Sequence, residues 1–281
     1  MTATPAPTTV RVTLAQLAVP ADRERAREDA VDAVRTGARD GAAVVVLPEY
    51  ASGFDPRGVG TDHAEPLVGP FVSAVRAAAR AEGVAVLTGT TLPGTEPDRA
   101  VNAVVAVTPG GEVAGVYRKV HLYDAFGHRE SDRLEPGDPA AAPLVLDVGG
   151  LRFGVMTCYD LRFPESARRL VDAGADVLVV PAAWAAGAGK AAQWRALAVA
   201  RAIENTAVVL GAGQAGRGVV GGSLAVAADG AVLAALNSRP GTLTVDVAAA
   251  DIAAVRERNP SLVNRRYTVV PRDGGRPAVA P

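Results

Sequence analysis

Short apolar runs that end at proline or glycine recur along this chain and alternate with amphipathic segments of helical period. Four of the runs are AAVVVLPEY, GVAVLTG, ADVLVVP and TAVVLGAG. A short continuous apolar run is typical of a strand that is buried on both faces. Charged segments with an apolar face lie between the runs, over about 21–38, 66–82, 165–174 and 190–204. The alternation predicts an α/β protein with helices outside a mixed sheet.

Turn signals join several of the predicted strands into hairpins. Pro-Gly-Gly separates NAVVAVT from EVAGVYRKV, Gly-Gly separates LVLDV from LRFGV, and Asp-Gly divides SLAVAADGAVLAAL. Both halves of the chain mix hairpins with strand–helix units, and no stretch rich in Pro, Gly or Ser divides them. We expect one domain over residues 8–270, built from two similar halves whose sheets stack face to face. Residues 1–7 are expected to form a disordered lead, and residues 271–281 a flexible tail.

The composition is that of an ordinary globular protein. Hydrophobic residues make up 49% of the chain and charged residues 21%, and the formal net charge is -1. No basic field therefore indicates nucleic acid or a membrane surface as a partner. The amino terminus lacks the basic and apolar regions of a signal peptide, and no apolar run approaches the roughly 20 residues that span a bilayer. A single cysteine cannot form an internal disulfide, so we expect a cytoplasmic protein.

The only cysteine, Cys158, ends an apolar run in VMTCYDLRFPE and is followed at once by polar residues. A strand end that opens into a turn can present a nucleophile from rigid structure, but a free cysteine is also commonly an inert buried residue. A reactive thiol needs a neighbouring base or a positive charge. Among the three histidines, His63 is expected to be solvated in a polar loop, while His121 and His128 stay open as partners for the thiol.

Two further charged residues end predicted strands. Glu49 follows the apolar run in VVVLPEY, and Lys119 ends the strand in AGVYRKVHLYD. Lys119 is one of only two lysines in the chain, and the other, Lys190 in a Gly/Ala stretch, is attributed to chance. A thiol, a carboxylate and an ammonium that meet at one sheet edge would supply a nucleophile, a proton carrier and a fixed positive charge.

Three motifs that contain these residues resemble a known family. LPEY, YRKVHLYD and CYDLRFPE are similar to the signature motifs of the nitrilase, or carbon–nitrogen hydrolase, superfamily, and they occur in the family's order. VTLAQL, PAAW, WRALAVARAIEN and GGSLAVAADGAVLA extend the resemblance over roughly residues 8–268. CYDLRFPE and KVHLYD most resemble the branch of Nit-type ω-amidases and deaminated-glutathione amidases.

The resemblance implies a four-layer αββα sandwich with two mixed sheets and helices outside. It implies that Glu49, Lys119 and Cys158 form the catalytic triad and that no metal or organic cofactor takes part. A second glutamate of the family stands between the lysine and cysteine motifs, shortly before a Pro-Gly. Glu130 matches that position, whereas Glu135 lies nearer to the Pro-Gly but fits the spacing less well. Association through the helix layer, as a homodimer or a higher homo-oligomer, is also implied.

The chemistry of the triad predicts an amide hydrolysis through a thioester. Glu49 would accept the proton of the Cys158 thiol and later activate a water molecule. The Lys119 ammonium and the backbone N–H of Tyr159 would stabilise the oxyanion of the tetrahedral intermediate. Lys119 itself is not expected to act as the base, because neighbouring carboxylates favour its charged form. Glu130 is expected to orient Lys119 and the substrate amide.

Substrate contacts are predicted from position alone. Arg162 follows Cys158 by four residues, where it could hold a substrate carboxylate or form an internal ion pair with Asp160 or Glu165. Further candidates for lining the pocket are Trp184, Phe126, His128 and Phe163. We therefore expect a small carboxamide substrate that carries a carboxylate, with a nitrile or an N-carbamoyl compound as the alternative. A binding or regulatory protein without catalysis is the alternative from another class.

The stretch GAGQAG fits the pattern G-x-G-x-x-G and follows a predicted strand. A dinucleotide site also requires a helix to begin there, so that its N-terminus meets the pyrophosphate. The following RGVVGGSLAV is rich in β-forming residues and broken by glycine. We expect a tight backbone turn and no NAD at this position.

Overall fold

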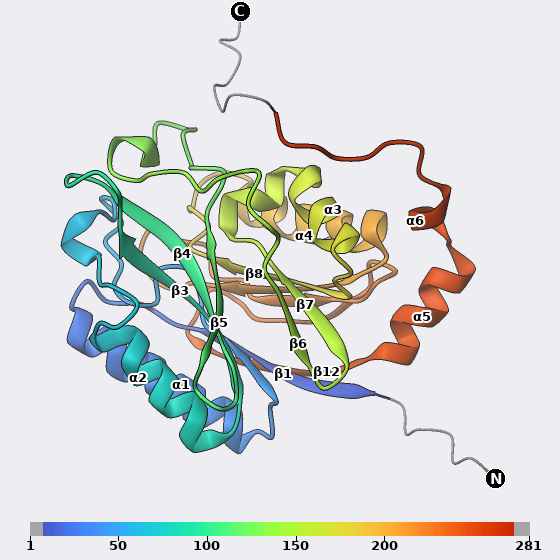
Figure 1. Ribbon diagram of the computed structural model, residues 1–281, viewed down its shortest axis with the longest axis horizontal. Coiled ribbons are helices and arrows are strands. Elements are labelled where there is room, and N and C mark those ends of the chain that lie inside the picture. Colours follow the sequence, from blue (N-terminus) through green and yellow to red (C-terminus); the bar gives the residue numbers. More distant parts are fainter. Residues whose placement is uncertain (1–7, 273–281) are drawn as a thin grey trace, which may run out of the picture.

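The computed structural model describes residues 8–272, which form two six-stranded mixed sheets (Figure 1). The strand order is β12-β1-β2-β3-β4-β5 in the first sheet and β11-β10-β9-β8-β7-β6 in the second. The first contains β1 (Thr9–Gln16), β2 (Val44–Val46), β3 (Ala85–Pro93), β4 (Ala100–Val107), β5 (Val113–Arg118) and β12 (Gly241–Ala248). The second contains β6 (Val145–Val148), β7 (Leu151–Val155), β8 (Val177–Ala182), β9 (Val208–Gly213), β10 (Leu224–Val226) and β11 (Val232–Ala235).

The two sheets pack face to face through their apolar side chains. One continuous core joins Val12 and Val46 of the first sheet to Phe153, Val179 and Leu210 of the second. The central strands run parallel, and the outer strands pair antiparallel, mostly with a strand next to them in the chain. The two halves of the chain are not separated cleanly, because β12 returns to pair along the whole of β1.

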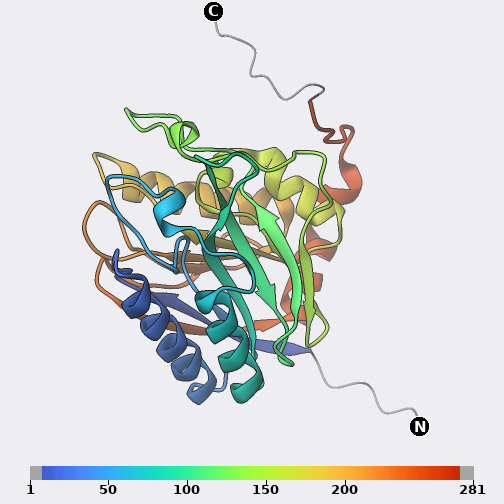
Figure 2. The same ribbon diagram turned by 60° about the vertical axis from the view of Figure 1, so that its left-hand side comes forward.

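Helices cover the outer face of each sheet, which completes four layers (Figures 1 and 2). The first sheet is covered by α1 (Arg23–Arg39) and α2 (Pro70–Glu82), and the second by α3 (Pro164–Asp172) and α4 (Lys190–Asn205). Two helices, α5 (Ala249–Arg258) and α6 (Ser261–Asn264), follow β12, and short 3-10 segments are η1 (Thr61–His63), η2 (Glu130–Asp132) and η3 (Cys158–Arg162). The expected αββα sandwich is confirmed.

Local sequence explains where the covering helices begin and end. The side chain of Asp22 accepts a hydrogen bond from the N–H of Arg25 and so caps the start of α1. Pro70 occupies the first turn of α2, where its missing N–H costs nothing, and Gly83 ends that helix in the left-handed conformation. Phe71 and Val75 lie one turn apart on α2 and are buried against the sheet.

The structure can be compared with the sequence predictions for several loops and turns. The GAGQAG stretch runs from β9 into a turn before β10, so a helix does not begin there. His63 is buried rather than solvated, with its ring beside the Asp62 carboxylate at 3.0 Å. The lead expected over 1–7 lies outside the described residues, as does the tail expected over 271–281 apart from its first two positions. Over the described range, no helix has the length and apolarity needed to cross a membrane.

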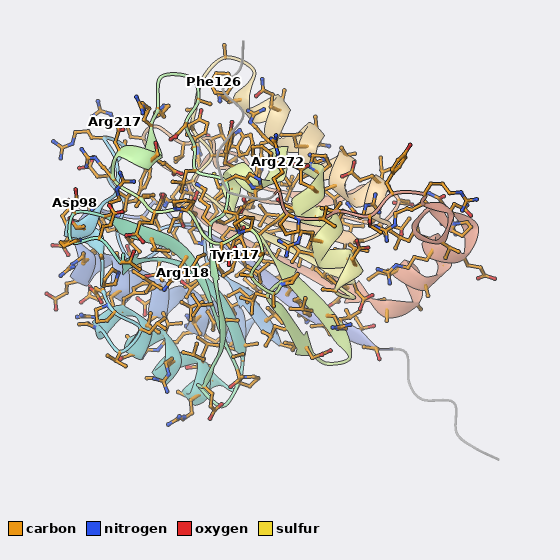
Figure 3. The ribbon with its side chains drawn as sticks, turned by 45° about the horizontal axis from the view of Figure 1, so that its top comes forward. Asp98, Tyr117, Arg118, Phe126, Arg217 and Arg272 are labelled. Carbon is orange, nitrogen blue, oxygen red and sulfur yellow. The ribbon has the colours of Figure 1, made fainter. Side chains whose placement is uncertain are left out.

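The topology brings the carboxyl ends of four strands to one place. Glu49 follows β2, Lys119 follows β5 and Cys158 follows β7, while Ala183 directly follows β8. The last residues of β5, Tyr117 and Arg118, are labelled in Figure 3. Because β2, β3 and β5 run in the same direction, as do β7 and β8, the segments that follow them emerge at a common edge.

Gly89 of β3 lets the segment that carries Glu49 pack closely against the sheet, because glycine has no side chain. A Cβ atom at Gly89 would lie 2.5 Å from the Cα of Glu49 and 2.5 Å from the carbonyl oxygen of Pro48. We therefore expect Gly89→Ala to lower the free energy of unfolding by about 1–3 kcal/mol, as overpacking of a rigid core does. Urea unfolding measures this, with Gly241→Ala as the control, where the nearest heavy atom would lie 3.9 Å away. Equal stability of the two variants would show that the segment yields without cost.

Candidate active site

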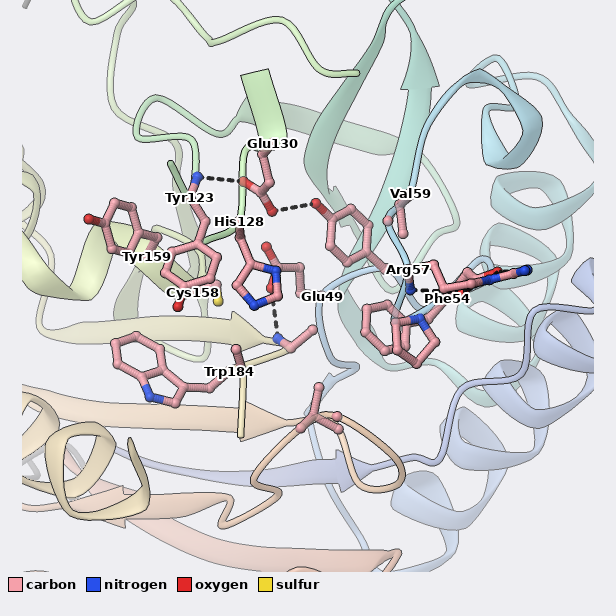
Figure 4. Close-up of a pocket in the computed structure, with 18 of the residues that line it drawn as sticks. Glu49, Phe54, Arg57, Val59, Tyr123, His128, Glu130, Cys158, Tyr159 and Trp184 are labelled. Atoms are coloured by element: carbon pink, nitrogen blue, oxygen red, sulfur yellow. Dashed lines mark hydrogen bonds and ion pairs between the residues drawn. The ribbon is translucent and has the colours of Figure 1, made fainter. Parts of the chain in front are cut away.

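Glu49, Lys119 and Cys158 converge in one buried site, and Figure 4 shows Glu49 and Cys158 at its cavity. The Lys119 Nζ donates a hydrogen bond to the Glu49 Oε1 at 2.9 Å, and the charge of the same carboxylate raises the pKa of the buried Cys158 thiol. Each side chain comes from the end of a different strand, so rigid sheet geometry fixes their relative positions. The convergence expected from the strand ends is therefore present in the structure.

The Glu49 carboxylate is held by three donors from three elements. Oε1 accepts from Lys119 and from the side-chain amide of Asn102 at 2.7 Å, and Oε2 accepts from the backbone N–H of Ala183 at 2.7 Å. The Gln214 amide donates to the backbone oxygen of Glu49 at 2.6 Å. These bonds fix the carboxylate against the thiol, in one orientation.

The Lys119 ammonium lies between two carboxylates. Besides Glu49, it donates to Glu130 at 2.8 and 3.1 Å, and Glu130 also accepts from the Tyr50 hydroxyl at 2.9 Å and the Tyr123 N–H at 2.7 Å. Burial alone would lower the pKa of Lys119, but Glu130 and Glu49 outweigh it and hold that pKa well above its ordinary value. Lys119 is therefore a fixed positive charge at any physiological pH.

Cys158 sits at a sharp bend between β7 and η3. Its φ of 46° lies in the left-handed region, which is costly for a residue with a Cβ atom and is common at functional sites. Burial, followed by the negative charge of Glu49, raises the pKa of the thiol well above its ordinary value. The resting cysteine is therefore a neutral thiol, and its proton must pass to a neighbour when it reacts. The adjacent acceptor is Glu49.

Asp160 ties the cysteine turn to the segment after Lys119. One carboxylate oxygen accepts from the Tyr117 hydroxyl at 2.7 Å and the Thr157 N–H at 3.0 Å, and the other contacts the His121 Nδ1 at 2.7 Å. The His121 ring also stacks on Phe163, with centroids 3.7 Å apart. This buried network keeps Cys158 and Lys119 in register across the gap between the sheets.

The histidines offer the thiol no base in this arrangement. His121 is engaged by Asp160 and Phe163, and His128 stacks on Tyr123 at the wall of the cavity, with ring centroids 5.2 Å apart. Glu135, the other candidate for the second glutamate, accepts from the backbone N–H groups of 95 and 96 in an exposed turn. It is Glu130, therefore, that contacts Lys119.

A cavity opens above the thiol and contains most of the predicted substrate contacts. Glu130 and Tyr159 line it together with Arg162, Trp184 and His128. The Tyr159 N–H lies in the first turn of η3, where a backbone N–H has no acceptor within the helix. Two predicted pocket residues lie elsewhere: Phe163 packs on His121, and Phe126 is 65% exposed outside the cavity lining.

Arg162 makes neither of the internal ion pairs considered for it. It donates to the Gln193 side chain at 2.7 Å, and its guanidinium lies 5.0 Å from the centre of the Trp184 ring. Asp160 is occupied by His121 and Tyr117, and over residues 8–272 Arg162 has no carboxylate within ion-pair distance. Arg162 therefore brings an uncompensated positive charge to the cavity.

Sequence reasoning missed several residues of the site. Asn102 stands as a polar residue inside the apolar strand NAVVAVT, and Tyr50 directly follows Glu49, so both carried a visible signal. Lys190, which was attributed to chance, lines the cavity at the start of α4. Its Gly/Ala surroundings are those of an exposed loop, and only the fold shows that this loop turns inward.

Comparison with known proteins agrees with the fold and the site. Residues 11–257 match the carbon–nitrogen hydrolase family. The chain is 35% identical to a deaminated glutathione amidase of Escherichia coli O157:H7 over 258 residues, which cover 91% of this chain and 97% of that protein.

Two solved structures share the architecture. A carbon–nitrogen hydrolase superfamily protein of Xanthomonas campestris, with an arsenic adduct in its active site, superposes with a TM-score of 0.83 at 26% identity, covering 94% of this chain and 99% of that one. A variant of an amidase from Nesterenkonia sp. AN1, in which acrylamide has added to the active-site cysteine, gives 0.74 at 29% identity, covering 91% and 98%. The chain belongs to the carbon–nitrogen hydrolase family, within the nitrilase superfamily.

Proposed function

We propose that this protein hydrolyses a small carboxamide that carries a carboxylate, and that it does so through a thioester on Cys158. The observation that carries the proposal is the meeting of the buried Cys158 with the Glu49 carboxylate at one cavity, with the Lys119 ammonium in contact with that carboxylate. The amidase names of the relatives and the cysteine adduct in the Nesterenkonia amidase support the same chemistry.

The first step forms the bond between sulfur and the carbonyl carbon. As Cys158 attacks, its proton passes to Glu49, and the electron pair of the carbonyl moves to the oxygen. The negative charge thus leaves the carboxylate and appears on the oxyanion, still beside Lys119. Because Glu49 is locked by Asn102 and Ala183, it is already oriented for this transfer and no side-chain ordering is needed.

The oxyanion would be stabilised by the Lys119 ammonium and the Tyr159 N–H. Where such donors have been removed, each has cost about 3–4 kcal/mol of transition-state stabilisation. Glu49 then gives its proton to the leaving nitrogen, the C–N bond breaks and ammonia departs. Glu130 acts as a positioning residue, since it holds Lys119 from the side opposite Glu49.

The second half of the reaction regenerates the thiol. Glu49 takes a proton from a water molecule while the water oxygen attacks the thioester carbon, and a second oxyanion forms in the same place. When this intermediate collapses, the carbon–sulfur bond breaks, the sulfur recovers the proton from Glu49, and the carboxylic acid product leaves. One carboxylate therefore moves every proton in the cycle.

The position of Arg162 supports the proposal that the substrate carries a carboxylate. It is a planar donor suited to bidentate contact with such a group, and it stands uncompensated in the cavity wall above Trp184. A nitrile or an N-carbamoyl substrate would use the same triad. The leading proposal predicts that amides release ammonia without carbon dioxide and that nitriles release no ammonia. Carbon dioxide would instead indicate an N-carbamoyl substrate, and ammonia from nitriles would indicate a nitrilase. A protein without catalysis would release no ammonia at all.

The wider assignment is also a proposal. We infer that residues 8–270 work as one catalytic domain, in the cytoplasm, as a homodimer or higher homo-oligomer that binds no nucleic acid. The buried single cysteine fits a reducing compartment, and the exposed apolar side chains of Val263, Tyr267 and Val270 near the carboxyl end fit contact between copies. Sedimentation velocity reads the oligomeric state directly.

Substitution of the triad tests the proposal. Cys158→Ala should abolish ammonia release, because it removes the only thiol in the chain and leaves Glu49 with no adjacent nucleophile to activate. Lys119→Arg should lower kcat/KM by roughly a hundredfold or more, because a planar fork cannot fill the place of a compact ammonium between two carboxylates. Circular dichroism of the purified variants checks that the fold survives. Near-normal turnover by Cys158→Ala would overturn the proposed mechanism.

The protonation of Cys158 tests the role of Glu49. Because the Glu49 charge raises the pKa of the thiol, Glu49→Gln should lower that pKa, although turnover is lost. The cysteine is the only one in the chain, so the 13Cβ signal of labelled cysteine reports this group alone across a pH titration. Glu257→Gln, which removes an exposed carboxylate of α5, serves as the control. An unchanged or higher midpoint in Glu49→Gln would contradict the geometry.

Arg162→Ala tests substrate charge. It should raise KM for the monoamide of a short dicarboxylic acid by about tenfold or more, since a hydrogen-bonded ion contact is lost. KM for the matched amide, in which a hydroxymethyl group replaces the carboxylate, should change little. Steady-state ammonia release with both substrates gives the comparison, and equal effects on the two would remove the carboxylate-binding role.

A further inference from the structure

Lys190 is a second buried cation in the wall of the cavity, and the triad chemistry makes no use of it. It is the first residue of α4 and only 7% of its surface is exposed. Its Nζ donates a hydrogen bond to the Tyr123 hydroxyl at 2.8 Å and lies 3.3 Å from the centre of the Phe126 ring. Over residues 8–272, no carboxylate lies within ion-pair distance of it.

Lys190 and Arg162 form a pair of like charges in the same wall. Both stand over Phe126, and Arg162 lies 5.5 Å from the centre of that ring. Burial and the nearby Arg162 lower the pKa of Lys190, so the two cations repel each other in a desolvated place. The Nε of Arg162 is buried and has no hydrogen-bond partner within the described chain. The pair therefore lacks an anion that its geometry and charge would favour.

The carboxylates of the cavity floor cannot serve as the missing counter-charge of Lys190 and Arg162. Glu49 and Glu130 both contact Lys119, and each is further bound by hydrogen bonds from its own neighbours. The remaining partners of Lys190 and Arg162 are a phenol, an amide and aromatic rings, which are neutral. An unpaired buried charge is expensive, so an anion that supplies the counter-charge would be bound favourably here.

We propose that Lys190 and Arg162 together form a two-cation subsite that holds the far carboxylate of the substrate's acyl chain. A substrate whose amide lies on Cys158 would place its carboxylate between the two cations. This inference rests on the proposed amide hydrolysis and adds Lys190 as a residue that determines specificity. Arg162 of η3 supplies the planar fork, and Lys190 at the start of α4 supplies a point charge.

Phe126 makes this subsite strong by shielding it. The residue is 65% exposed and stands at the edge of the molecule in Figure 3, with a left-handed φ of 56° that turns its ring over Lys190. In the free protein the ring face offers the ammonium a weak negative partner. With a carboxylate bound beneath, the same ring would keep water away, and the ion contact would be worth more.

The side chain of Lys190 is not needed to build the cavity wall. Its backbone oxygen accepts the hydrogen bond from the Trp184 indole at 3.1 Å, and any residue at this position supplies that oxygen. The side chain contributes one hydrogen bond, to Tyr123, and its charge. A glutamine can keep the hydrogen bond and remove the charge, which separates binding from structure.

Lys190→Gln tests the subsite through substrate charge. For the monoamide of a short dicarboxylic acid, KM should rise by about tenfold or more with kcat within about twofold. For the matched neutral amide with a hydroxymethyl end, both constants should stay close to those of the wild type. Lys190→Arg, which keeps the charge, should recover part of the preference. Arg195→Gln removes an exposed charge from the same helix and should change neither substrate.

The outcomes separate this inference from the proposed function. If the wild type releases ammonia from the amides but Lys190→Gln affects charged and neutral substrates equally, the subsite is wrong and the hydrolase proposal stands. If the wild type prefers the neutral amide, the two-cation subsite is also wrong. Absence of ammonia from every amide would overturn the proposed function itself. In that case, titration calorimetry can still test the subsite by measuring the affinity for a dicarboxylate. The subsite predicts that Lys190→Gln binds the dicarboxylate more weakly than the wild type and Arg195→Gln do.

Discussion

The buried ion contact of Lys119 with Glu49 and Glu130 is the constraint on which the rest of the site depends. Three charges lie in a desolvated place, and any one of them alone would cost several kcal/mol to bury. Together they compensate one another, and further hydrogen bonds hold each carboxylate, from Asn102 and Ala183 to Glu49 and from Tyr50 and Tyr123 to Glu130. The segments after β2 and β5 and the η2 turn are therefore held at one point, because none can leave without stranding a charge.

This contact also explains why the cysteine is neutral at rest. The two carboxylates and the ammonium already sum to one negative charge, and a thiolate would add a second without water to screen it. In the proposed mechanism, transfer of the thiol proton to Glu49 during attack would keep the sum unchanged. The negative charge would move from the carboxylate to the oxyanion, while Lys119 stays beside both. Catalysis of this kind needs little reorganisation, which is what a preorganised site provides.

The strand ends could be predicted from sequence because they obey local rules. Apolar runs mark buried strands, and a charged or reactive residue directly after such a run must lie at a sheet edge, which located Glu49, Lys119 and Cys158. Contacts set by tertiary packing could not be read in this way. Nothing local distinguishes Phe163, which packs on His121, from an aromatic residue of the cavity, or Lys190 from an exposed loop lysine.

The cavity has opposite electrical character at its two ends, and this decides how a substrate can enter. At the floor, Lys119 is outweighed by Glu49 and Glu130, so a carboxylate placed there would be repelled. In the wall, Arg162 and Lys190 have no counter-charge among residues 8–272, so a carboxylate placed there would be attracted. The proposed substrate, with an amide at one end and a carboxylate at the other, would thus be oriented before any bond changes. Its neutral end would meet the thiol because its charged end is attracted to the wall, and the same polarity would reject a dicarboxylate product from the floor once the amide is gone.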